Sequence, residues 1–277
     1  MSQFTYCLNT STVQGQKLSL PQLIDLTADA GYGAIEPWIG EIEAHVAAGG
    51  TLADLRKRIE DRGLKMASAI GFAPWIVDDA AERKKGLEHA RKDFELVAAL
   101  GGSLIAAPPV GRHELPDLNL FAAAERYVAL YDLGQQFGVT PMIEVWGFSR
   151  CLNRLGEAAF IAVESGRAGA TILADVYHLR RGGSDPAGLR LLNGDAIRLF
   201  HINDYPGDIA AEKLNDSDRV YPGDGAGPVR EIADSLRAIG SKAFLSLELF
   251  NADYWKQDAL TVAKTGLEKM KRSIGDL

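Results

Sequence analysis

The sequence predicts a (β/α)8 TIM barrel, formed as a single domain over residues 1–277. Strand-like and helix-like segments alternate eight times along the chain, a pattern typical of a parallel sheet with right-handed crossovers. The length suits one barrel, and the composition shows no linker or low-complexity segment that would divide it. No G-x-G-x-x-G motif follows the first strand-like segment, which disfavours an open dinucleotide-binding sheet.

Strands are expected where apolar, often β-branched residues run together before a turn. These runs fall at residues 4–8, 34–35, 64–70, 103–107, 139–145, 171–175, 197–202 and 243–249. The first helix is expected to follow a Ser19 cap and to end at Gly31, and the next to follow Thr51. Apolar residues at helical spacing predict the other helices. They lie at about residues 79–100, 119–137, 156–165 and 256–273, with two shorter ones after Pro186 and Pro228.

The composition restricts the class of partner. A formal net charge of -7 and a pI near 5.3 argue against nucleic acid, because phosphate binding depends on Lys and Arg. No stretch approaches the roughly 18 consecutive apolar residues of a membrane span, and the first residues do not resemble a signal peptide. The two cysteines, Cys7 and Cys151, are too few for a disulfide framework. We therefore expect a cytoplasmic protein that acts on a small molecule.

Four chemically active side chains lie in or at the end of the last four predicted strands. Glu144, Asp175, His201 and Glu248 occupy the fifth to eighth strands, one on each. The carboxyl ends of barrel strands converge on one mouth, where the active sites of this fold lie. Three carboxylates that close together repel one another unless a cation neutralises them. Carboxylates and imidazole are suitable ligands for a divalent cation, so the sequence predicts a metal site.

Pairing with arginine is the alternative explanation of these acids. For any one acid alone, a salt bridge to a nearby guanidinium is the better interpretation, whereas four groups on consecutive strands favour the metal. The arginines available in the neighbouring loops are Arg150, Arg154, Arg180, Arg181 and Arg219.

Other residues near the predicted mouth are candidates for substrate contact. His178 and Arg219 could bind substrate oxygens. Glu36 ends the second strand, and its carboxylate could either face the mouth or form a structural salt bridge. Aromatic side chains suit the apolar C–H faces of a sugar-like ring. Those that follow strands are Trp38, Trp75 and Trp146.

The roles of two further residue pairs stay open. Asn203 and Asp204, just beyond His201, could orient it, touch substrate or shape the following turn. Tyr254 and Trp255, expected to be exposed after the last strand, could contribute to a homodimer contact or to a neighbouring mouth.

At these positions the chain resembles the xylose-isomerase-like TIM-barrel superfamily, and within it the inosose isomerases of bacterial myo-inositol catabolism. The resemblance spans nearly the whole chain. It is densest in the segments Glu144-Val145-Trp146-Gly147, Asp175-Val176-Tyr177-His178, Phe200-His201-Ile202-Asn203-Asp204, Asp218-Arg219-Val220-Tyr221-Pro222-Gly223-Asp224-Gly225 and Ser246-Leu247-Glu248-Leu249-Phe250.

The resemblance implies one divalent metal ion (Mn, Mg, Zn or Co) bound by the four side chains described above. It further implies that Glu144 and Glu248 double as acid/base groups, and that His178 and Arg219 contact substrate oxygens. Ketose 3-epimerases carry a second Glu six residues after the first metal-binding Glu, and this chain has Arg150 there. The difference disfavours a free ketohexose as the substrate.

The expected reaction is proton abstraction next to a carbonyl, giving isomerisation or epimerisation of a keto-sugar or keto-cyclitol through an enediolate. Expulsion of a β-hydroxyl from the same intermediate would make the protein a dehydratase or lyase of inosose or 3-keto-glycoside type. An endonuclease IV-like phosphodiesterase is a more distant alternative, disfavoured by few histidines and an acidic composition. A non-catalytic sugar-binding barrel is disfavoured because both candidate acid/base glutamates are present.

Overall fold

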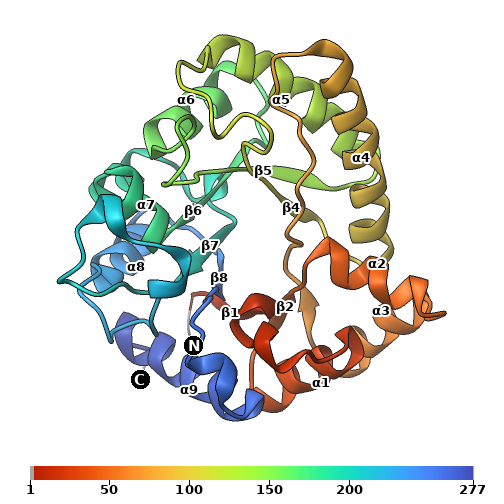
Figure 1. Cartoon of the computed structure of the whole chain (residues 1–277), viewed down its shortest axis with the longest axis vertical. Helices are drawn as coiled ribbons and strands as arrows, with labels where there is room; N and C mark the ends of the chain where they lie inside the picture. The colour runs from red at the N-terminus through yellow and green to blue at the C-terminus, as the bar shows by residue number, and fades with distance from the viewer. Residues whose placement is uncertain (1–2, 277) are drawn as a thin grey trace.

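An eight-stranded parallel sheet, curled into a ring, forms the centre of the computed structural model, which describes residues 3–276 (Figure 1). The strands are β1 (Thr5–Asn9), β2 (Ala34–Glu36), β3 (Lys65–Met66), β4 (Leu104–Ala107), β5 (Thr140–Glu144), β6 (Thr171–Asp175), β7 (Leu199–Ile202) and β8 (Phe244–Leu247). Each lies within a predicted run or one residue beyond it. The predicted TIM barrel is confirmed.

The ring is joined between its first and last strands. The strand order is β3-β2-β1-β8-β7-β6-β5-β4, so β1 pairs with β8. Between β3 and β4 a hydrogen bond from the Ala106 amide to the Ala69 carbonyl (2.9 Å) spans the gap. The regular part of β3 is shorter than the predicted 64–70, because Ile70 leaves the ladder and bonds with Pro37 and Ile39 instead.

Helices surround the ring (Figure 1). They are α1 (Leu20–Ala30), α2 (Ile39–Ala47), α3 (Leu52–Asp61), α4 (Ala80–Ala99), α5 (Leu120–Gln135), α6 (Leu155–Glu164), α7 (Val176–Gly182), α8 (Val229–Ala238) and α9 (Ala259–Ile274). Ser19 and Thr51 precede α1 and α3 as predicted, and Gly31 ends α1 with a φ of 92°, a left-handed conformation that glycine tolerates.

The predicted helices differ from the structure in three places. Helices α2 and α7 were not expected, because each begins almost at once after its strand: Pro37 and Trp38 alone separate β2 from α2, and β6 runs directly into α7. The helix expected after Pro186 is a 3-10 segment, η2 (Pro186–Leu191). Helix α7 is important for the site because Asp175 caps it: its carboxylate accepts a hydrogen bond from the His178 amide (3.0 Å).

The apolar core has two layers. Inside the ring, small and medium side chains fill the barrel, among them Cys7, Ala34, Leu104, Met142 and Leu199. A larger cluster fills the space between the sheet and the surrounding helices. The packed interior closes the barrel below the strand ends, so a polar site can form only at the mouth.

The predicted exposure of Tyr254 and Trp255 is wrong. Both are half-buried within the chain, because Tyr254 stacks on Tyr221 at 4.1 Å between ring centroids and the Trp255 indole donates to the Ser11 carbonyl (3.0 Å). Among the helices of residues 3–276, none combines the length and apolar character needed to cross a bilayer.

Candidate active site

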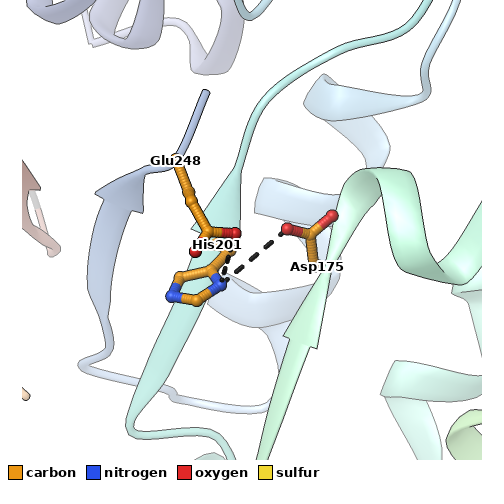
Figure 2. A group of neighbouring side chains, drawn as sticks. All are labelled: Asp175, His201 and Glu248. Carbon is orange, nitrogen blue, oxygen red and sulfur yellow. Dashed lines mark ion pairs between the residues drawn. The ribbon is translucent and has the colours of Figure 1, made fainter. Parts of the chain in front are cut away.

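Asp175, His201 and Glu248 meet at the carboxyl ends of β6, β7 and β8 (Figure 2). One oxygen or nitrogen from each lies within 4.8 Å of the others. The sheet register explains why: Asp175 pairs directly with His201 across β6 and β7. The His201 Nδ1 lies 3.2 Å from the Glu248 Oε2 and 3.8 Å from the Asp175 Oδ2. All three side chains are buried.

Arg219 lies against the same two acids. Its Nη1 donates to the Asp175 Oδ2 (2.8 Å) and to the Glu248 Oε2 (2.7 Å), and its Nη2 donates to the Asp216 Oδ1 (2.5 Å). The salt-bridge alternative therefore holds in part, for one arginine. Of the other arginines considered, Arg154 and Arg181 bond to the backbone carbonyls of Gly183 and Leu214.

The other ring nitrogen of His201, Nε2, contacts Glu36. This nitrogen lies 3.0 Å from the Oε2 of Glu36. This oxygen also accepts hydrogen bonds from the side-chain Nδ2 of Asn9 (2.9 Å) and the hydroxyl of Ser246 (2.7 Å). Glu36 has no exposed surface and does not line the cavity above the site. It therefore contacts His201 on the Nε2 side of the ring, opposite the side that faces Asp175 and Glu248.

Glu144 occupies the same mouth but lies outside the three-residue cluster. It ends β5, is buried and lines the cavity together with Glu248. Burial raises the pKa of Glu144 to about 8; the charge of His201 opposes this rise and that of Glu248 adds to it. Its Oε2 is buried with no hydrogen-bond partner among the described residues. The carboxyl group is therefore available to a ligand.

The ionisable groups of the cluster influence one another strongly. Burial alone would raise the pKa of Glu248, but His201 and Arg219 outweigh it and lower that pKa to about 2. The pKa of Asp175 is raised by burial despite the opposing charge of Arg219. Burial disfavours the charged form of His201, yet Glu248 and Glu36 raise its pKa well above the ordinary value. Relative to an ordinary glutamate, Glu144 therefore holds its proton to a higher pH and Glu248 loses its proton at a lower pH.

Aromatic rings form much of the cavity wall. Trp38 and Trp146 line it, whereas Trp75 does not: it is buried in the core, with its indole bonded to the Ala107 and Pro108 carbonyls. Ring centroids are 5.3 Å apart for Trp38–Phe72, 6.3 Å for Phe72–Trp146 and 5.1 Å for Trp146–Phe148. The full lining is Trp38, Ile70, Phe72, Glu144, Trp146, Phe148, His178, Asp216, Arg219, Glu248 and Phe250.

His178 and Arg219 direct hydrogen-bond donors into this cavity. The amide of Gly147 donates to the His178 Nδ1 (3.2 Å), and burial holds the pKa of His178 well below its usual range. A neutral ring whose Nδ1 accepts carries its proton on Nε2. That Nε2 lies 3.3 Å from the Nη2 of Arg219, so the two nitrogens lie side by side at the cavity. An oxygen of a bound molecule can accept from both.

The structure assigns both residues that follow β7. The Nδ2 of Asn203 donates to the Asp175 Oδ2 (3.0 Å), and its Oδ1 accepts from the Tyr177 amide (3.1 Å). Asp204 accepts hydrogen bonds from the amides of Gly223 (2.9 Å) and Gly227 (2.7 Å). Asn203 therefore orients a cluster carboxylate, whereas Asp204 holds the loop beyond.

The donor set fits a divalent metal ion. His201 Nδ1 and Glu144 Oε2 are both buried and make no hydrogen bond within residues 3–276. Buried polar atoms are normally hydrogen-bonded, so two buried atoms that lack a hydrogen bond at a mouth with two further carboxylates fit a ligand. Nitrogen and oxygen donors of this kind suit Zn²⁺, Mn²⁺ or Co²⁺.

The sequence did not reveal several residues of the site. Asn9 ends β1 and could have been found by applying the strand-end argument to the first strand. Ser246 lies two residues before Glu248, inside β8, and has no distinguishing sequence signal. The rings of Phe72, Phe148 and Phe250 come from loops whose paths the pattern does not predict.

The chain is thus a TIM barrel with a buried cluster of acids and an imidazole at its strand ends, a donor set that fits a divalent metal ion. Residues 24–273 match the family model described as xylose isomerase-like TIM barrel. The chain belongs to this family.

Individual relatives agree with this membership. The chain is 26% identical to inosose isomerase from Bacillus velezensis over 265 residues, which cover 95% of this chain and 94% of the relative. It is 26% identical to 3-dehydroshikimate dehydratase from Pseudomonas aeruginosa, over 91% of this chain but 39% of the relative. A solved structure of the IolI protein with a bound zinc atom superposes with a TM-score of 0.90 at 22% identity, covering 99% of both chains.

Proposed function

We propose that this protein is a divalent-metal-dependent isomerase or epimerase that moves a proton next to the carbonyl of a keto-sugar or an inosose-like keto-cyclitol. The observation that carries the proposal is the pair Glu144 and Glu248. Both line one cavity, and their surroundings shift their pKa values in opposite directions, to about 8 and about 2. Such a divergence suits an acid and a base working on one substrate.

Three or four side chains would hold the metal. Asp175, His201 and Glu248 are the proposed ligands, with Glu144 as the fourth. A divalent ion there polarises the substrate carbonyl and acidifies the neighbouring C–H group. The similarity to the zinc-containing IolI structure supports a bound metal ion, and metal analysis decides among Mn, Mg, Zn and Co.

The protein's own groups then handle the proton. The carboxylate of Glu248 removes a proton from the carbon next to the carbonyl, and that electron pair forms a carbon–carbon double bond. The former carbonyl oxygen gains negative charge, which the donors of His178 and Arg219 stabilise. Glu144, or a substrate hydroxyl, returns a proton. If the hydroxyl proton of the original carbon moves to the former carbonyl oxygen and carbon protonation occurs at the former carbonyl carbon, the original carbon becomes the new carbonyl and the product is an isomer. Return to the other face of the original carbon restores the first carbonyl and gives an epimer.

The aromatic lining is proposed to bind the substrate ring. Trp38 and Trp146 present apolar faces to the cavity, and stacking of a ring's C–H groups on them would align its oxygens with the acids below. Glu36, proposed from sequence as a substrate contact, is better explained by a different role, given below.

A dehydratase is the second candidate. The similarity to 3-dehydroshikimate dehydratase covers 91% of this chain, and loss of a β-hydroxyl from the same intermediate needs no additional residue type. The two reactions differ in whether the product has lost water.

Incubation of the metal-loaded protein with inososes, ketohexoses and 3-keto-glycosides, followed by NMR and mass spectrometry, tests the proposal. An isomerase or epimerase yields a product of unchanged mass, and a dehydratase yields one that has lost a water molecule. Absence of any conversion with every substrate class, by a protein shown to hold metal, contradicts both.

A further inference from the structure

We infer that Glu36 is a positioning residue: it fixes the ring of His201 so that the Nδ1 lone pair points at the metal, and thereby sets the metal affinity of the site. This inference deepens the proposed function, because it rests on the metal site proposed there. Neither the sequence pattern nor the family comparison gives Glu36 this role.

The position of Glu36 excludes direct contact with substrate. It ends β2, its exposed fraction is 0%, and it is not among the residues that line the cavity. A carboxylate in the interior is costly unless it is hydrogen-bonded or paired. Among the described residues, its ion-pair partner is His201. The role of this carboxylate must therefore be exerted through that imidazole.

The hydrogen bonds around Glu36 determine the tautomer of His201. The Glu36 Oε2 already accepts from Ser246 and from Asn9, so it is an acceptor toward the His201 Nε2 as well. The proton of a neutral His201 is thus on Nε2, and the lone pair is on Nδ1. Nδ1 is the atom that faces Asp175 and Glu248 (Figure 2).

Asn9 connects this arrangement to a second ligand. Its Oδ1 accepts hydrogen bonds from the Trp38 indole (3.2 Å) and the Ser11 amide (3.0 Å). The amide nitrogen must therefore face the acids, where it donates to Glu36 (2.9 Å) and to the Oε1 of Glu248 (3.3 Å). One network consequently orients both His201 and Glu248.

A carboxylate behind a ligating histidine fixes the ring and makes its free nitrogen a better donor. Glu36→Gln keeps the size of the side chain but removes its charge and leaves one acceptor oxygen. We expect the dissociation constant for Zn²⁺ or Co²⁺ to rise by about 10- to 100-fold.

The matched control is Glu41→Gln. Glu41 is half-buried nearby, and its Oε2 also accepts two hydrogen bonds, from Thr10 (2.7 Å) and from the Trp38 amide (2.9 Å), but it does not contact His201. Metal dissociation constants are measured by competition with a chromophoric chelator for the wild type and both variants. Circular dichroism checks that they fold. The inference requires weaker binding in Glu36→Gln alone; equal affinity in Glu36→Gln and the wild type overturns it.

A measurement on the wild type covers the case in which Glu36→Gln does not fold. In the Co²⁺-loaded protein, a histidine bound through Nδ1 with its Nε2 proton buried against Glu36 gives a hyperfine-shifted N–H proton signal that exchanges slowly in D2O. A missing or rapidly exchanging signal contradicts the inference. These readouts are independent of turnover, so a protein that binds metal but converts no sugar refutes the proposed function without touching the role of Glu36.

Discussion

At this site, two carboxylate oxygens each contact more than one neighbouring polar or charged side chain. The Oδ2 of Asp175 accepts hydrogen bonds from Arg219 and Asn203, and the Oε2 of Glu248 accepts one from Arg219 while lying 3.2 Å from the His201 Nδ1. Because these atoms are also the proposed metal-facing ones, the charge on each residue affects metal binding and catalysis together.

Replacing either candidate acid/base group separates the two roles. Glu144→Gln and Glu248→Gln are each expected to lower kcat by roughly 10²- to 10⁴-fold, the usual contribution of a general acid or base. Glu248→Gln should also lose more of its metal than Glu144→Gln, because Glu248 belongs to the buried three-residue cluster and Glu144 is the proposed fourth ligand outside it. Metal analysis and kinetics on both variants check this. Full metal loss in Glu144→Gln with full retention in Glu248→Gln would reverse our assignment.

Metal binding should be linked to pH through His201. The carboxylates around the ring raise the pKa of His201 well above its ordinary value, so a metal that binds Nδ1 displaces a proton. Affinity should therefore increase as the pH rises, with at least one proton released per ion bound. Calorimetric titration in buffers of different ionisation enthalpy measures this release. A pH-independent affinity would mean that His201 is not a ligand.

At the level of strands and helices, the sequence predicted most of the elements that position the site. Apolar runs located the strands that carry Glu144, Asp175 and His201, because buried parallel strands are continuously apolar. Helix α7 was missed because Asp175 serves both as the last strand residue and as the helix cap. A side chain with two structural roles leaves no separate loop signal.

Helix α4 carries a buried acid that the proposed mechanism does not use. Asp93 is 1% exposed, neither of its oxygens has a hydrogen-bond partner within residues 3–276, and its Oδ1 lies 3.5 Å from the His89 Nε2. Burial, aided by the charge of Glu43, raises the pKa of Asp93 from 3.8 to about 7. The protonated form of Asp93 is therefore favoured in the folded protein below about pH 7.

Asp93→Asn should stabilise the protein in a pH-dependent way. An acid with a raised folded-state pKa costs no stability below its unfolded pKa, and the cost grows between pH 4 and 7. Removing the charge should raise the free energy of unfolding by about 2–4 kcal/mol at pH 8, by less at pH 5 and by little at pH 4. Urea unfolding at the three pH values tests the prediction. An equal effect at every pH would show that ionisation is not the cause.

At the scale of the whole molecule, the barrel brings together residues from distant parts of the chain. Asn9, Asp175 and Glu248 come from three strands, yet belong to one hydrogen-bonded network through Asn203 and Arg219. Strand-end position was enough to predict which residues converge. It could not predict that Glu36 lies behind His201, because that depends on side-chain direction within the mouth.

A ligand that binds only the folded barrel must stabilise it. At a free metal concentration of about 100 times the dissociation constant, the gain is about 2.7 kcal/mol, which corresponds to an increase in Tm of roughly 5 °C for a chain of this size. Differential scanning calorimetry with Zn²⁺ or Mn²⁺ measures it, with Asp175→Asn as the variant that should lose the increase. The same increase in both proteins would place the metal elsewhere.

Proton exchange at the substrate tests the central claim most directly. The metal-loaded protein and its Glu248→Gln variant are incubated with an inosose in D2O, and deuterium at the carbon next to the carbonyl is followed by NMR. The proposed mechanism predicts incorporation with the wild type and a loss of roughly 10²-fold or more in its rate with the variant. Incorporation at the same rate in both proteins would contradict the assignment of Glu248 as the base.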